Sequence, residues 1–421
     1  MDSFVIEGGI PVQGNVAISG SKNAALPILC SSILADDTCT YKKIPNLRDI
    51  RTIMEVLANL GMQVSWARRG SVLIKPTKIT SQEAPYDLVK SMRASILVLG
   101  PLLAKYGKAK VSLPGGCAIG VRPIDMHLKG LAKMGADINL YHGYVVASAN
   151  GLQGARIVFD KQTVGGTENI MMAATLAKGT TVIEGAAKEP EIVDLADALV
   201  RMGANIAGAG SSTVTIEGVK SLAGLDYEVI PDRIETGTFI VAAAITHGQL
   251  MISGVRHDLI LSVVEKLREM GVIIKEIDRD KLFVDGRCEI LPVDVVTAPY
   301  PGFPTDMQAQ IMALACIAQG VSSITETIFE NRFMHVPELM RMAAKLEEKG
   351  NTVIVRGIKQ FQGASVMATD LRASASMVLA ALNAQGPTEI RRIYHLDRGY
   401  EQLDMKLQSI GARVKRIRGE L

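Results

Sequence analysis

The chain has 421 residues, of which 48% are hydrophobic, 21% charged and 4% aromatic, and its net charge is +3. At roughly 100–200 residues per domain, this length predicts two or three domains, and the composition excludes a disordered protein. The balance of 46 basic and 43 acidic residues argues against non-specific binding to nucleic acid or membranes. Because the sequence shows neither a secretory signal pattern nor an apolar stretch of membrane-spanning length, we expect a cytoplasmic protein without membrane insertion.

Cofactor and metal motifs are missing from the sequence. The five cysteines are odd in number and widely spaced, with no Cys-x-x-Cys pair and no histidine pair at zinc-finger spacing. The glycine-rich signatures of ATP and dinucleotide sites are also incomplete. We therefore expect no disulfide scaffold, no metal and no cofactor.

Six apolar stretches, rich in Ala and Leu, recur along the chain, most of them followed by Gly and a β-prone run. Because they are apolar nearly all round, we expect helices that are buried on all sides. In chain order they are residues 24–35, 97–106, 170–178, 239–247, 311–319 and 377–385.

A second recurring unit alternates with the first. It is a charged amphipathic helix, then Gly, then an alternating strand, with glycines on average about 70 residues apart. These glycines are Gly61, Gly135, Gly203, Gly271, Gly350 and Gly411. Chance recurrence is the alternative, but two ordered series favour a true repeat of strand, apolar helix, strand, amphipathic helix, strand. We predict an α/β protein with buried helices inside and sheets outside, an inverted barrel, grouped as three repeats in each of two domains.

Cations lie where the buried helices are predicted to begin. Helix capping explains the Ser, Thr, Asn and Asp residues there, but Lys22, Arg93 and Arg372 oppose the helix dipole by roughly 0.3–1 kcal/mol each. Each could instead form a structural ion pair. As a set they favour a site for an anion such as phosphate, and Arg398, which we expect to open another helix, joins them.

The segment 113–127 holds unusual local chemistry. Cys117 lies beside Gly115 and Gly116, and Arg122 follows, so the thiol can be wet and close to positive charge. Such a thiol can exchange protons near neutral pH. An ordinary buried cysteine is the alternative, and we accept it for the other cysteines, Cys30, Cys39, Cys288 and Cys316.

Three further groups of polar residues each have a structural alternative. Asp306 follows a Pro-rich turn at a predicted helix start, where an N-cap is the alternative. His335 and His395 are more simply structural histidines. The basic C-terminus is most simply a solvated face; its residues are Arg413, Lys415, Arg416 and Arg418.

At these residues the sequence resembles the UDP-N-acetylglucosamine 1-carboxyvinyltransferase family of enolpyruvyl transferases. The resemblance covers essentially the whole chain and is specific, because long motifs occur in order. They are residues 19–27, 114–117, 231–237, 303–310, 330–338, 369–374 and 397–401.

The resemblance implies an inside-out α/β barrel of two domains with three repeats each. Residues 22–230 would form the first domain, and 1–21 with 231–421 the second. The chain would cross between them near 20–22 and 230–233, and these crossings would act as a hinge. The active site would lie in the cleft between the domains, and closure would exclude water.

The implied reaction adds the 3′-hydroxyl of UDP-N-acetylglucosamine to phosphoenolpyruvate and then eliminates phosphate. By the family pattern Cys117 is the general acid, can form a pyruvate adduct and is alkylated by fosfomycin, while Asp306 is the base. Cations would hold the phosphate and carboxylate; they are Lys22, Arg122, Arg372 and Arg398. The other substrate-binding positions implied are Asn23, Arg93, Pro123, Ile124, Asp125, Met126, Lys161, Thr163, Val164, Gly165 and Ile328.

Two alternatives remain open. A shikimate-phosphate enolpyruvyl transferase would share the fold, but the loop that carries Cys117 argues against it. A non-catalytic paralogue that binds the UDP-sugar would lack the reactive residues, which are present here. The sequence does not define the oligomeric state.

Overall fold

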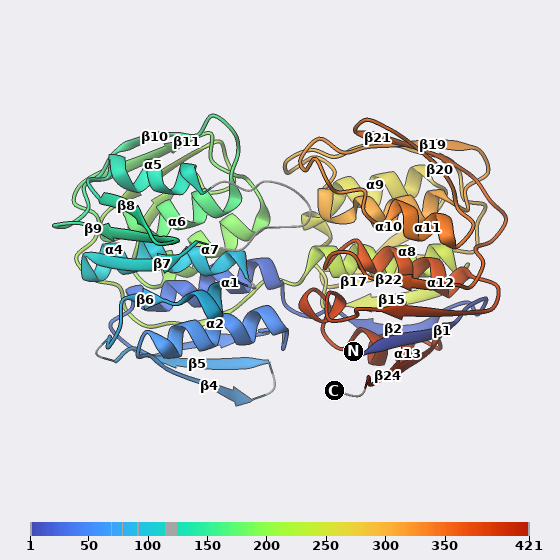
Figure 1. The fold of residues 1–421 in the computed structure, drawn as a ribbon, viewed down its shortest axis with the longest axis horizontal. Coiled ribbons are helices and arrows are strands. Elements are labelled where there is room, and N and C mark those ends of the chain that lie inside the picture. The colour runs from blue at the N-terminus through green and yellow to red at the C-terminus, as the bar shows by residue number, and fades with distance from the viewer. Residues whose placement is uncertain (1, 69, 78, 91, 114–123, 420–421) are drawn as a thin grey trace. The chain divides into compact units, whose positions relative to one another are not determined.

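The computed structural model describes residues 2–68, 70–77, 79–90, 92–113 and 124–419. The chain divides into two compact units, coloured along the chain in Figure 1. Unit 1 contains residues 2–19 and 231–419, and unit 2 contains residues 20–113 and 124–230. The chain leaves unit 1 after Ser19 and returns to it at Pro231.

One repeat shows the plan of all the sheets. Its parallel pair is β10 (Arg156–Val158) and β11 (Thr180–Glu184), joined by the buried helix α6 (Val164–Ala174). Helix α7 (Pro190–Arg201) then leads to β12 (Asn205–Ala207), which forms a hairpin with β13 (Thr213–Glu217). Strand β13 lies between β11 and β12 and is antiparallel to both. The predicted repeat is confirmed, except that it omitted this fourth strand.

Within the described residues, six four-stranded sheets follow this plan, each with one parallel pair. The other sheets of unit 2 contain β14 (Asp226–Glu228), β3 (Cys39–Lys42), β5 (Ser71–Lys75) and β4 (Gln63–Arg68), and β6 (Glu83–Ala84), β7 (Lys108–Ser112), β9 (Tyr144–Ser148) and β8 (Asp137–Tyr141). Those of unit 1 contain β16 (Ile273–Asp278), β17 (Lys281–Asp285), β15 (Gln249–Ser253) and β2 (Gln13–Ala17), then β18 (Asp294–Val296), β19 (Val321–Thr325), β21 (Thr352–Arg356) and β20 (Lys345–Lys349), and β22 (Ser365–Met367), β23 (Pro387–Arg391), β1 (Ser3–Glu7) and β24 (Arg413–Ile417).

The N-terminal strands complete sheets made from the far end of the chain. In Figure 1, β1 and β2 lie in unit 1 beside strands of the second half of the sequence. Strand β1 pairs with β23 and β24, and β2 pairs with β15 in parallel. The two sheets of unit 1 that contain β1 and β2 are therefore complete only when the first 19 residues are in place.

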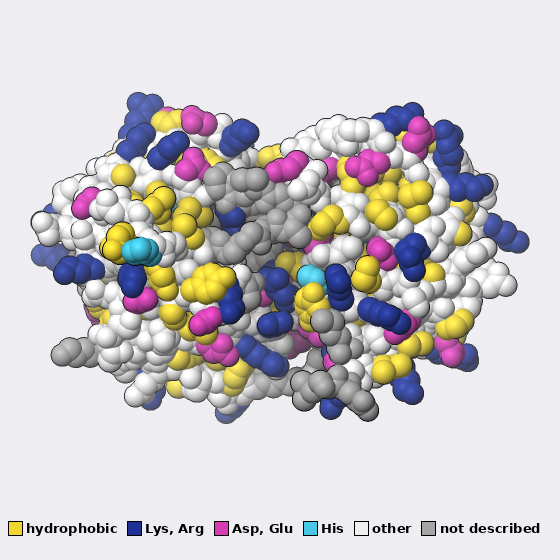
Figure 2. All heavy atoms as spheres, viewed as in Figure 1, with side chains coloured by type: hydrophobic (Ala, Val, Ile, Leu, Met, Phe, Trp, Pro, Cys, Tyr) yellow, Lys and Arg dark blue, Asp and Glu magenta, His cyan; other side chains and the backbone are white. Residues whose placement is uncertain are grey.

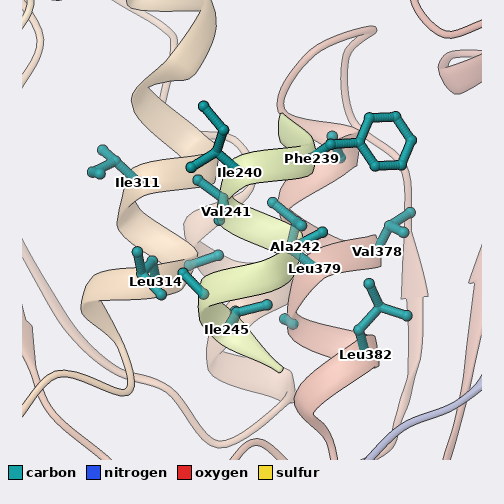
Figure 3. Packing of buried hydrophobic residues seen from close by; sticks show 14 of the residues in the cluster. Phe239, Ile240, Val241, Ala242, Ile245, Ile311, Leu314, Val378, Leu379 and Leu382 are labelled. Carbon is teal, nitrogen blue, oxygen red and sulfur yellow. The ribbon is translucent and has the colours of Figure 1, made fainter. Parts of the chain in front are cut away.

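The apolar helices form the centre of each unit. They are α1 (Lys22–Ser31), α4 (Leu99–Tyr106) and α6 in unit 2, and α8 (Arg233–Ile245), α10 (Gln308–Ala315) and α12 (Ser374–Asn383) in unit 1. Figure 3 shows Val241 and Ile245 of α8 with Ile311 of α10 and Leu379 of α12, all of them fully or almost fully buried. Since these helices are buried on nearly all sides, apart from the partly buried last turn of α4, the prediction of inside helices and outside sheets is confirmed.

The amphipathic helices are α2 (Arg48–Asn59), α5 (Asp125–Lys133), α7, α9 (Leu261–Glu269), α11 (Val336–Arg341) and α13 (Leu403–Ser409). Two residues after most of them stands a predicted glycine in the left-handed region, with φ from 90° to 107°. The prediction is wrong at Gly350, which lies in the hairpin between β20 and β21. After α11 the left-handed position belongs to Ala343, with φ of 70°.

Several buried helices begin elsewhere than predicted. Thr163 caps α6 and Asp232 caps α8, so both helices start before the apolar stretches that the sequence analysis identified. Helix α4 starts two residues later than predicted, because a 3-10 segment precedes it, whereas α10 starts three residues earlier. The short segments are η1 (Ser32–Leu34), α3 (Tyr86–Val89), η2 (Arg93–Val98), η3 (His257–Leu259), η4 (Thr305–Met307) and η5 (Leu396–Arg398).

The surface agrees with the balanced composition. On the face drawn in Figure 2, basic and acidic side chains are interspersed. Among the described residues, none of the helices combines the length and the apolar character needed to cross a lipid bilayer.

Candidate functional site

Arg372 lies in unit 1, two residues before α12, and is held from several directions. Its Nη2 donates to Asp232 Oδ2 at 2.8 Å, its Nη1 donates to the carbonyl oxygen of Gly399 at 2.9 Å, and its guanidinium lies 5.1 Å from the centre of the Tyr400 ring. The carboxylate of Asp370 fixes the turn by accepting from the backbone N–H of Arg372. The side chain is 1% exposed, so its orientation is fixed by the fold.

Arg372 and Asp232 each stabilise the charged form of the other. Burial disfavours a charged guanidinium, but Asp232 raises the pKa of Arg372 above its ordinary value. Burial would likewise raise the pKa of Asp232, but Arg372 outweighs it and lowers that pKa. The structural ion pair that the sequence left open for Arg372 is therefore present. Its Nε has no hydrogen-bond partner among the described residues and lies 3.9 Å from Asp306 Oδ2.

Asp306 is held by a second arginine that the sequence analysis did not single out. Arg332 Nη2 donates to Asp306 Oδ1 at 2.7 Å, and its Nη1 donates to Thr305 Oγ1. Arg332 is almost fully buried, whereas the Asp306 side chain is 26% exposed. Asp306 is not the N-cap that the alternative required, because η4 is capped by Pro304 and α10 follows Met307. The carboxylate is thus oriented by a guanidinium and open to solvent.

Two buried polar side chains in the same unit have atoms without a hydrogen-bond partner within the ranges that the structure describes. His335 is fully buried, and neither ring nitrogen has a hydrogen-bond partner among the described residues. The pKa of His335 is lowered to about 4, mainly by burial, which outweighs the opposing effect of Asp370, and the positive charge of Arg332 acts in the same direction as burial. The Oδ2 atom of Asp370 is also buried without a partner in the described part of the chain. His335 is therefore a neutral imidazole near neutral pH.

The prediction that Arg398 begins a helix is wrong. Arg398 is the last residue of the 3-10 segment η5, and the next helix, α13, begins at Leu403. The residues around Arg398 are tightly held. The hydroxyl groups of Tyr400 and Thr238 form a hydrogen bond at 2.9 Å, and the Glu401 carboxylate accepts from Ser19 Oγ at 2.6 Å.

In unit 2, Lys22 is the first residue of α1, as predicted. It is buried, and its Nζ lies 3.5 Å from Asp49 Oδ2, so the structural alternative holds for this cation as well. Arg93, which is partly buried, begins η2 and not a regular α-helix. Asn23 is also partly buried.

A buried histidine lies beside the start of α6. His127 Nδ1 is 3.1 Å from Asn169 Nδ2, and Asn169 Oδ1 accepts from the backbone N–H of Gly100. Since that Asn nitrogen is a donor, His127 must accept at Nδ1 and carry its proton on Nε2. Burial, and then Arg93, lowers the pKa of His127 to about 4. A Cβ at Gly165 would lie 3.2 Å from the His127 ring.

The remaining predicted ligand positions are distributed as follows. Thr163 caps α6 through Gly166, and Asp125, exposed on α5, pairs with Lys129 at 3.3 Å. Lys161 and Val164 are exposed and Ile124, Met126 and Ile328 partly buried. Cys117, Arg122 and Pro123 lie outside the described residues.

The other cysteines behave as the sequence predicted. Cys30, Cys39 and Cys316 are buried and Cys288 is partly buried, all with free thiols. Burial raises the pKa of each of these thiols above its ordinary value. They are therefore poor nucleophiles at neutral pH.

Comparison with known proteins defines the class. The family model described as EPSP synthase (3-phosphoshikimate 1-carboxyvinyltransferase) matches residues 6–407. Two solved structures share the fold: the enolpyruvyl transferase NikO from Streptomyces tendae, with a TM-score of 0.87 at 24% identity over 99% of this chain and 98% of that one, and EPSP synthase from Acinetobacter baumannii, with 0.79 at 17% over 99% and 100%. The class is that of the carboxyvinyltransferases.

Closer relatives carry one name. The UDP-N-acetylglucosamine 1-carboxyvinyltransferase of Thermodesulfovibrio yellowstonii is 56% identical over 419 residues, which are 99% of this chain and 100% of the relative. The enzyme of that name from Geobacter metallireducens is 57% identical over 419 residues, with the same coverage. The chain belongs to the UDP-N-acetylglucosamine 1-carboxyvinyltransferase family, and it is a transferase.

Proposed function

We propose that the protein transfers the enolpyruvyl group of phosphoenolpyruvate to the 3′-hydroxyl of UDP-N-acetylglucosamine and releases phosphate, the first committed step of peptidoglycan precursor synthesis. Support comes from relatives named for this activity at 56% identity over nearly their whole length. The structural observation that carries the proposal is Asp306, a partly exposed carboxylate 2.7 Å from Arg332 and 3.9 Å from Arg372.

Asp306 and Cys117 would move the protons. In the addition step, the sugar oxygen forms a bond to C2 of phosphoenolpyruvate, Asp306 takes the hydroxyl proton, and the Cys117 thiol gives its proton to C3. In the elimination step, C3 loses a proton, the bond from C2 to the phosphate oxygen breaks, and the carbon double bond forms again. The Arg332 ion pair supports the role of Asp306, because it fixes the carboxylate before the substrate arrives.

Lys22, Arg122, Arg372 and Arg398 would bind the phosphate and carboxylate groups. Arg372 fits this role because its orientation is fixed before any substrate is bound, so no reorganisation is needed as charge develops. In this proposal residues of both units act on the same pair of substrates. Thr163, Gly165 and their neighbours at the start of α6 would contact the nucleotide-sugar, where free backbone N–H groups favour a diphosphate.

A phosphate-release assay with purified protein tests the proposal. Phosphoenolpyruvate is supplied with either UDP-N-acetylglucosamine or shikimate 3-phosphate. We expect release with the UDP-sugar alone. Release with shikimate 3-phosphate alone would assign the chain to the related enzyme. Binding of the UDP-sugar without release in either assay would indicate a non-catalytic protein.

A further inference from the structure

We infer that Arg416, on the C-terminal strand, is a positioning residue that fixes Arg398 for phosphoenolpyruvate binding. The inference rests on the proposed role of Arg398. Arg416 Nη1 and Nη2 donate to the two oxygens of Asp397 at 3.0 and 2.6 Å, and its Nε donates to Asp404 Oδ2 at 3.1 Å. Nη1 also lies 3.5 Å from Asp2 Oδ2. A cation with three carboxylates is not the simply solvated residue that the sequence suggested.

The place of Arg416 in its sheet is unusual for a charged side chain. In the register of β24 with β1, Arg416 pairs with Phe4 and shares a face with Val414, and both of these residues are buried. The guanidinium lies 5.0 Å from the centre of the Phe4 ring, and its side chain is 24% exposed. An inward-facing charge is unfavourable unless it is paired, so the carboxylates around it are required.

The other sheets show which residue stands at the position of Arg416 where no neighbouring segment has to be fixed. In four of the five described strands that correspond to β24, the equivalent residue lies two positions after a buried or partly buried residue and pairs with the equivalent of Phe4, whereas β12 ends before this position. This residue is exposed in all four strands; the residues are Trp66, Leu140, Glu276 and Glu348. Coverage at Arg416 is therefore not a consequence of the repeat. It comes from Asp397 of η5 and Asp404 of α13.

Asp397 immediately precedes Arg398, so the bidentate pair acts on the backbone that carries the proposed clamp residue. On the other side of Arg398, the carbonyl oxygen of Gly399 accepts from Arg372 at 2.9 Å. The short segment η5 is thus fixed by one arginine on each side of Arg398. A planar guanidinium suits this task because it holds both oxygens of a carboxylate at once, which lysine cannot do.

The test compares Arg416→Met with Arg413→Met. Arg413 lies on the same strand and pairs with Glu7 at 3.3 Å, but that pair is exposed at 69% and 61%. We expect Arg416→Met to raise KM for phosphoenolpyruvate by about tenfold, within the range of coupling energies in charged networks, while KM for UDP-N-acetylglucosamine changes by less than about twofold. Arg413→Met should change neither constant. Equal rises in both KM values, or the same effect at Arg413, would overturn the inference.

A double-mutant cycle separates this inference from the clamp role itself. In an Arg398→Ala background, Arg416→Met should add no further rise in KM for phosphoenolpyruvate, because the side chain that it positions is gone. An additive rise would overturn the inference, and so would a silent Arg416→Met beside an effective Arg398→Ala. A silent Arg398→Ala would overturn the clamp role and this inference with it. Arg416→Lys, which keeps the charge without the planar fork, replaces the Met variant if that one does not fold, and the same expectations apply.

Discussion

Arg372 and Asp232 form an ion pair at 2.8 Å that joins the N-cap of α8 to the turn before α12, and neither side chain is more than 5% exposed. Asp232 also accepts from the backbone N–H groups of Ile234 and Glu235. Arg372, the cation that we propose to bind substrate, is therefore part of the framework of unit 1. Stability and binding should respond together when this pair is changed.

Asp232→Asn should lower the free energy of unfolding by about 3–5 kcal/mol, because it leaves a buried guanidinium without its counter-charge. Asparagine keeps the capping oxygen, so loss of the cap does not explain the result. The measurement is urea unfolding. The control is Asp258→Asn, whose pair with Arg256 is about half exposed on both sides, where we expect less than about 1 kcal/mol. Equal effects at both positions would contradict the importance of burial.

Glu168→Gln should stabilise the protein at alkaline pH. Burial, and then Glu191, raises the pKa of the Glu168 carboxyl to about 8, above its ordinary value of 4.5. Between pH 4.5 and 8 the folded state thus keeps a proton that the unfolded state has lost. The stabilising contribution of the protonated Glu168 carboxyl is fully present below pH 4.5 and is lost as the pH rises through 8. The variant should gain a few kcal/mol at pH 8 and nothing at pH 4. Unfolding measured between these values checks this, with the exposed Glu55→Gln as the control.

His127→Gln should flatten the acid side of the stability curve. The folded state holds the pKa of His127 near 4, mainly by burial, below the ordinary value of 6.5. Its contribution is fully present above pH 6.5 and is lost as the pH falls towards 4, since the unfolded state then binds the extra proton. Wild type should lose about 3 kcal/mol more than the variant across this window. His142→Asn, at an exposed position with φ of 47°, should follow the wild-type curve.

The sequence predicted the buried helices and their order because a helix with no polar face can fold only in an interior. The sequence predicted the hairpin strands less accurately than the helices. The segment Lys345–Lys349 has the sequence KLEEK and is mostly exposed, so its composition favours a helix although its pairing with β21 makes it a strand. Sheet pairing is a non-local contact, and no local pattern records it.

The site residues divide in the same way. Arg372 and Lys22 could be selected from the sequence because a cation at a helix start opposes the helix dipole. Their counter-charges could not: Asp232 lies 140 positions from Arg372, and Arg332 lies 26 positions from Asp306. Arg332 stood inside a motif that we identified, but its burial, which makes it a positioning group, is a property of the packed unit. The same holds for Arg416, which looked like part of a solvated tail.

Cys117→Ala should lower turnover by at least about 10²-fold, because no other group is proposed to protonate C3 of phosphoenolpyruvate. Binding of UDP-N-acetylglucosamine, measured by calorimetry, should be nearly unchanged, since the thiol is assigned to proton transfer. Cys288→Ala is the matched control, and wild-type activity is expected there. Fosfomycin should alkylate the wild-type protein, with the added mass located on Cys117 by peptide mass spectrometry and absent from the Cys117→Ala variant. Normal rates without this thiol would remove it from the reaction, and an unmodified Cys117 after exposure to the epoxide would contradict its assignment as the reactive cysteine.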